Sequence, residues 1–90
     1  MTDNTSSKVC EIIKNTLTEC AAELGRTTDH LSDDDDFLQK GILDSFGYLD
    51  LIGALEDAFD LEIDIAELDE ANMVKISGLT AIILELLDRK

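Results

Sequence analysis

Three separate stretches of this chain carry apolar residues at helical spacing, and no proline interrupts any of them. The first stretch runs from about Ser6 to Leu24. Its apolar residues recur three or four positions apart, at Val9, Ile13, Leu17, Cys20 and Leu24, with Ile12 and Ala21 beside them. This spacing is typical of one buried face of an α-helix. Gly25 follows directly, and glycine is the preferred residue just beyond a helix end.

The second stretch, Ser45 to Phe59, has apolar residues on two faces. One face holds Tyr48, Leu51, Ile52, Leu55 and Phe59. The other holds Phe46, Leu49 and Gly53, which we call the Phe46 strip. A small domain rarely covers both sides of a helix. Either this helix lies at the centre of the fold, or the Phe46 strip is a docking surface with acidic residues beside it, namely Asp50, Glu56 and Asp57.

The third stretch predicts a helix from Ser77, an acceptable N-cap, to Asp88. Its apolar positions are Leu79, Ile82, Ile83, Leu86 and Leu87. Between the second and third helices, alternating apolar residues from Asp60 to Ile65 indicate a buried loop, because an isolated strand has nothing to pair with. A brief helical turn from Ala66 to Ala71 is expected next, with Leu68 facing inward.

A long connection, from Arg26 to Leu43, joins the first two helices. It contains four consecutive aspartates, residues 33–36, followed by Phe37. Counting from Asp33 or from Asp36 does not reproduce the glycine and ligand positions of an EF-hand loop. The run is therefore interpreted as a solvated loop that Phe37 anchors to the core, with calcium binding as a weaker hypothesis. The expected fold is all-α, a single domain over residues 1–90 with three main helices, one short helix and a frayed segment at residues 1–5.

The net charge of the chain limits the classes of partner that it can bind. The 90 residues include 21 Asp and Glu against 7 Lys and Arg, a net charge of −14. Such a chain repels phosphate backbones and anionic lipid, which argues against nucleic-acid binding and favours basic protein partners. No apolar run reaches the ~20 residues of a membrane span, and the N-terminal residues lack the apolar region of a signal peptide. We expect a cytoplasmic monomer.

The sequence offers little for catalysis or metal binding. Cys10 and Cys20 lie ~15 Å apart along the first helix, too far for a disulfide, and are expected to be reduced. The single histidine, His30, lies in a polar loop, and no glycine-rich phosphate loop or metal-spaced Cys and His set occurs. We therefore expect a protein that is not an enzyme and binds no metal.

The most informative segment is residues 41–46, Gly-Ile-Leu-Asp-Ser-Phe, which places Ser45 in the first turn of the second helix. An Asp-Ser pair at such a position often serves only as a helix cap. A helix N-terminus also favours a phosphoester on the serine, through its unpaired N–H groups and its dipole. Ser45 has no general base nearby in the sequence, so another enzyme would have to modify it.

The segment GILDSFGYLDLIGALEDAFDLEI resembles the core motif of acyl carrier proteins and of the related peptidyl and D-alanyl carriers. In that family an Asp-Ser pair between apolar residues opens the second helix, as Asp44 and Ser45 do here. The matching positions continue through Leu51, Leu55, Glu56 and Phe59 to Leu61 and Ile63. The order of helices agrees as well, so the resemblance extends over nearly the whole chain.

The resemblance implies that a phosphopantetheinyl transferase attaches 4′-phosphopantetheine from coenzyme A to Ser45. The thiol of this arm would hold an acyl or aminoacyl group as a thioester for fatty-acid, polyketide or nonribosomal-peptide biosynthesis. Loading and processing enzymes with basic surfaces are the implied partners. Their expected contacts are Asp44, Phe46, Leu49, Asp50, Gly53, Glu56 and Asp57. Asp44 would also orient the arm.

Gly47, Tyr48 and Ala58 depart from the pattern of fatty-acid carriers, and Gly47 lowers helix propensity by about 1 kcal/mol relative to Ala. Residues 60–69 are more similar to D-alanyl and other stand-alone carriers. The expected role is therefore a dedicated pathway carrier. The alternative hypothesis is an unmodified, acidic helical module for protein–protein interaction.

Overall fold

The computed structural model describes residues 5–69 and 71–89, and within them it contains helices and no strand. These residues form three α-helices, α1 (Thr5–Glu23), α2 (Ser45–Phe59) and α3 (Ile76–Arg89), together with a 3₁₀ turn, η1 (Ile65–Glu67). The all-α prediction is confirmed. Of the segment expected to fray, residues 1–4 lie outside the described residues, and Thr5 is the first residue of α1.

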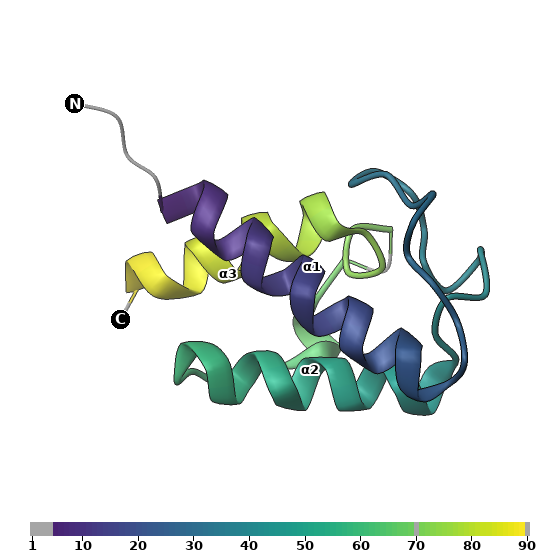
Figure 1. Ribbon diagram of the computed structural model, residues 1–90. Coiled ribbons are helices and arrows are strands. Elements are labelled where there is room, and N and C mark those ends of the chain that lie inside the picture. Colours follow the sequence, from purple (N-terminus) through teal and green to yellow (C-terminus); the bar gives the residue numbers. More distant parts are fainter. Residues whose placement is uncertain (1–4, 70, 90) are drawn as a thin grey trace.

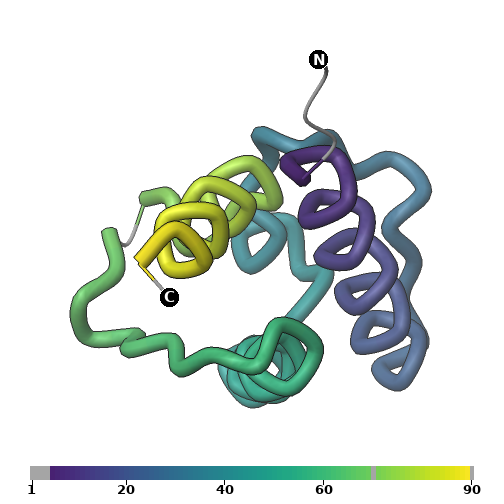
Figure 2. The backbone as a smooth tube through the Cα atoms, turned by 90° about the vertical axis from the view of Figure 1, so that its left-hand side faces the viewer, coloured from purple at the N-terminus to yellow at the C-terminus, as the bar shows by residue number. Residues whose placement is uncertain are grey.

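α1 is the common support of the fold, because α2 and α3 both pack against it (Figure 1). Within the described residues, the backbones of α2 and α3 make no such close contacts with each other. Seen nearly end-on, the three helices stand at three corners, and the green segment that follows α2 runs along the outer side (Figure 2). Among the described helices, α2 therefore makes its close backbone contacts with α1.

The core lies where the apolar faces of the three helices meet. The fully buried side chains include Ile13, Leu17, Phe37, Leu51, Leu55, Leu79 and Ile83. α1 differs from expectation at its end, because Ala21 continues the buried face and Leu24 lies beyond the last helical residue, 41% exposed. Gly25 adopts φ +73°, which confirms its expected role in ending the helix.

Phe37 anchors the long connection, as expected. Its ring is fully buried and stacks on Tyr48 with a centroid separation of 6.0 Å. Its backbone is fixed too, since the Phe37 N–H donates to the carbonyl of Val74 and the Phe37 carbonyl accepts from the N–H of Ile42. Phe37 therefore fixes the connection both to α2 and to the turn before α3. The fixed part of the connection leads directly into Ser45.

Two expected boundaries were wrong. The helical turn expected over residues 66–71 is η1, which is shorter and begins at Ile65, where the Asp64 side chain caps it. Ser77 is not the N-cap of the last helix but its second residue. The Ser77 N–H donates to the carbonyl of Asp33, and its hydroxyl donates to the Asp34 carboxylate at 2.8 Å. The loop between α1 and α2 thus supplies polar partners for the first turn of α3.

Candidate functional site

Ser45 is the first residue of α2, and its side chain is exposed. Among the residues that the structure describes, none hydrogen-bonds to its hydroxyl or to the backbone N–H groups of Ser45 and Phe46. The next N–H, that of Gly47, donates to the Asp44 carboxylate at 2.7 Å. A hydroxyl and two N–H groups are therefore left facing solvent at the positive end of a helix dipole.

The backbone that carries Ser45 is held firmly. Leu43 is buried in the core two residues earlier, and its neighbour Ile42 donates its N–H to Phe37 at 2.9 Å. Gly41 adopts φ +75°, a conformation in which a larger side chain would be strained. The side chain of Asp44 closes this turn as the N-cap of α2. The capping role noted for the Asp-Ser pair is thus present, and it leaves the Ser45 hydroxyl free.

Gly47 has a packing role that the sequence did not reveal. It is buried, and a Cβ at this position would lie 3.3 Å from each of three atoms, in the side chains of Asp44, Leu24 and Leu43. The absent side chain lets Leu24, just past the end of α1, lie against the first turn of α2. Leu24 was expected in the core of the first helix. Instead it places a partly exposed apolar side chain against Gly47, two residues after Ser45 in the sequence.

The Phe46 strip lies open to solvent. Phe46 is 79% exposed, Leu49 is 55% exposed, and no atom lies within 4 Å of the position that a Cβ on Gly53 would occupy. The reading in which the fold covers both faces of α2 is therefore wrong. Asp50 and Asp57 are exposed on the same helix.

Glu56 differs from the other acidic residues of α2. It is half-buried, and its carboxylate accepts the N–H of Ile63 at 2.8 Å. This bond ties the loop after α2 back to the helix. No pattern in the sequence predicts it, because the two residues lie in different elements. Among the described residues, two of the expected contact residues have carboxylates already engaged within the chain, Asp44 with the Gly47 N–H and Glu56 with the Ile63 N–H.

Cys20, on α1, lies near Asp50 of α2 and is partly buried. Burial raises the pKa of its thiol, and the neighbouring carboxylates of Glu23 and Asp50 raise it further. The thiol therefore stays protonated near neutral pH, a form that is neither a good nucleophile nor a metal ligand. Cys20 behaves as a small apolar side chain beside the site.

The carboxylates of the four aspartates at residues 33–36 bond to separate partners and do not converge on one possible metal site. Each carboxylate has its own partner: Lys14 for Asp33, the Ser77 hydroxyl for Asp34, the Ser32 N–H for Asp35 and the N–H groups of Leu38 and Gln39 for Asp36. Within residues 5–69 and 71–89, no group of three potential ligands is placed to hold a metal ion. The calcium hypothesis therefore has no ligand set here. His30 is exposed in the same connection.

Comparison with known proteins gives one match. A family model described as a phosphopantetheine attachment site matches residues 15–75, which contain the end of α1, the long connection, all of α2 and η1. No curated protein and no solved structure gave a match. In the described part of the chain, none of the helices has the length and apolar character needed to span a bilayer.

Proposed function

This chain belongs to the family of phosphopantetheine attachment domains, and we propose that it is a carrier protein whose arm is attached at Ser45. Members of this family are carriers that bear 4′-phosphopantetheine as a prosthetic group. The arm supplies a thiol that holds acyl or aminoacyl cargo as a thioester. Ser45 is proposed because its hydroxyl is exposed and unbonded within the described residues, at a helix N-terminus with unpaired N–H groups.

The residues around Ser45 fit a phosphodiester. The N–H groups of Ser45 and Phe46 point out of the helix end and can donate to phosphate oxygens. Asp44 uses its carboxylate on the Gly47 N–H, which keeps the negative charge bonded within the turn. No base lies against the Ser45 hydroxyl in the described residues, so we infer that a phosphopantetheinyl transferase activates it and transfers the group from coenzyme A.

We infer that partner enzymes approach over α2. The Phe46 strip offers exposed apolar surface, and Asp44, Asp50 and Asp57 surround it with exposed carboxylates. From residue 41 to residue 74 the sequence has ten acidic residues and no Lys or Arg. A transferase or a loading enzyme with a basic and partly apolar surface fits this face, and raised salt should slow their association.

The cargo is proposed from the sequence alone. Residues 60–69 are similar to those of stand-alone carriers, which favours a dedicated pathway carrier for an amino acid or a specialised acyl group in the cytoplasm. The competing function, an unmodified interaction module, uses the same exposed Phe46 strip but needs no group on Ser45.

Intact mass separates these two functions. The purified protein is incubated with coenzyme A and a broad-specificity transferase. We expect a mass increase equal to one phosphopantetheine, which Ser45→Ala abolishes. Ser77→Ala is the matched control, because that hydroxyl is bonded to Asp34 and should leave the modification unchanged. No adduct on the unaltered chain, or an adduct that persists in Ser45→Ala, would contradict the proposal.

A further inference from the structure

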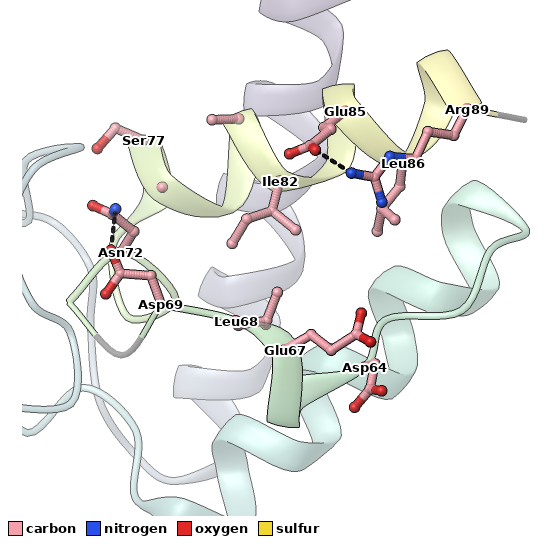
Figure 3. A pocket seen from close by; sticks show the side chains of 12 residues that line it. Asp64, Glu67, Leu68, Asp69, Asn72, Ser77, Ile82, Glu85, Leu86 and Arg89 are labelled. Carbon is pink, nitrogen blue, oxygen red and sulfur yellow. Dashed lines mark hydrogen bonds and ion pairs between the residues drawn. The ribbon is translucent and has the colours of Figure 1, made fainter.

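A groove lies between η1 and α3, on a part of the surface that does not include the Phe46 strip (Figure 3). Its volume is about 540 Å³. Three half-buried aliphatic side chains form its floor, Leu68 from the segment after η1 and Ile82 and Leu86 from α3. Figure 3 shows Leu68 and Ile82 pointing toward each other across the groove. The fold thus leaves a hollow apolar surface next to its core.

The rim of this groove is acidic. Among the described residues, its lining includes the carboxylates of Asp64, Glu67, Asp69 and Glu85 and one basic side chain, that of Arg89. Arg89 forms an ion pair with Glu85, one turn earlier on α3, so its charge is already offset. Glu67 is exposed, and its carboxylate has no partner among the described residues. An occupant that brings Lys or Arg to the rim would therefore gain electrostatic complementarity.

The dimensions indicate a helical occupant. The α3 wall of the groove runs from Ser77 to Arg89, ~18 Å at the rise of an α-helix. About three turns of a partner helix span this length and can place aliphatic side chains at i, i+3, i+4 and i+7 on the floor. A second copy of this chain is a poor occupant, because two molecules of net charge −14 repel each other.

We propose that the groove is a second docking site, which binds an amphipathic helix of a partner protein with one aliphatic edge flanked by Lys and Arg. The site is independent of the carrier chemistry proposed for Ser45. The α3 part of its lining also lies beyond residues 15–75, the stretch that the family model matches. Because the groove and the Phe46 strip share no residue, one partner can hold the carrier by the groove while another works at Ser45.

The test uses the full chain carrying Ser45→Ala, so that failure of the carrier proposal cannot affect it. The probe is a synthetic helical peptide of about four turns, with Leu at the four anchor positions and Lys on both flanks. Backbone amide NMR shifts should move at Leu68, Ile82 and Leu86, and affinity should fall as NaCl is raised. A second peptide with Glu in place of every Lys should not bind.

Glu67→Lys should weaken binding of the Lys peptide by about fivefold or more, because it reverses a rim charge. Asp29→Lys makes the same change in net charge on the exposed α1–α2 connection and should leave affinity within about twofold. Three results would overturn the proposal: no shifts in the groove, shifts confined to Phe46 and Leu49, or equal weakening by both variants. The proposal would also be overturned if the amide shifts in the groove appear only when an acyl group is loaded onto the phosphopantetheine arm of the unaltered protein. That result would assign the groove to the acyl cargo.

Discussion

Tyr48 joins three parts of the molecule through a single side chain. Its ring stacks on Phe37, and its hydroxyl donates to the carbonyl of Met73 at 2.8 Å. Burial raises the pKa of Tyr48 to about 12. The sequence placed Tyr48 on the apolar face of the second helix and marked it as a departure from the pattern of fatty-acid carriers, but it did not reveal these contacts. Its position shows why an aromatic residue with a hydroxyl is useful there, since it reaches from α2 across to the turn before α3.

The raised pKa of Tyr48 predicts a loss of stability at high pH. In the unfolded chain the phenol ionises near pH 10, whereas in the folded protein it holds its proton to about pH 12. The stabilisation is therefore complete below pH 10 and is lost as pH rises through this window, because the unfolded state releases its proton first. Urea unfolding from about pH 8 to about pH 11.5 should show this decline.

Tyr48→Phe is the control for that measurement. It removes the bond to Met73 and should lower the free energy of unfolding at neutral pH by about 1 kcal/mol. Its decline above pH 10 should be shallower, because only lysines and other shared groups still titrate. As the chain has one tyrosine, the ultraviolet absorbance of tyrosinate reports this group directly. Equal pH dependence in both proteins, or a phenol that titrates at pH 10 in the folded chain, would contradict the assignment.

At the scale of elements, the helices could be predicted because their causes are local. The bounds of α2 agree with expectation, since the apolar spacing and the Asp44 cap both lie within a few residues of it. The errors arise where the deciding partner is distant in sequence. Ser77 looked like an N-cap, but the partner of its hydroxyl is Asp34, in the first connection.

In the candidate site, too, the features with local causes could be predicted from the sequence, and those that depend on distant residues could not. Ser45 and the Phe46 strip could be proposed from local spacing, and the structure places them on exposed surface of α2. The bond from Ile63 to Glu56 and the position of Leu24 over Gly47 could not be predicted. Both depend on how a loop or a helix end returns to α2, which no periodicity within one element encodes.

Two helical glycines provide a matched test of element packing. A Cβ on Gly78 in α3 would lie 1.9 Å from the backbone oxygen of Asn72, so the preceding turn would have to move. Gly78→Ala should therefore lower the free energy of unfolding by about 2 kcal/mol or more, despite alanine's higher helix propensity. Gly53→Ala in α2 meets open space and should raise it by about 0.5–1 kcal/mol. Chemical denaturation measures both, and a stable Gly78→Ala variant would contradict the close packing.

At the scale of the whole molecule, charge is poorly balanced within the chain. The structure gives three ion pairs among the described residues, Lys14–Asp33, Lys40–Asp35 and Arg89–Glu85, against 21 acidic residues in the sequence. The basic side chain of each pair is exposed to solvent, and surface pairs of this kind contribute little to stability. The remaining carboxylates repel one another, and this repulsion opposes the compact state.

Salt should therefore stabilise this protein. Raising NaCl from about 10 mM to about 500 mM shortens the range of charge repulsion and should raise Tm by about 5 °C. Calorimetry measures the shift, and sucrose at matched osmolality is the control for solute effects unrelated to charge. Asp57→Lys should reduce the salt response, because it removes charge from the acidic stretch. A Tm that is flat or falls with NaCl would show that repulsion does not limit stability.

The use of α1 as the common support has a consequence for synthesis on the ribosome. The chain emerges from its N-terminus, so α1 is complete long before α3 exists. The buried face of α1, which includes Val9, Ile13 and Leu17, is shared between α2 and α3. Until both have emerged, part of that face stays in contact with water or with a chaperone. The nascent chain thus passes through a stage in which α2 and its serine have been synthesised but the core beneath them is incomplete.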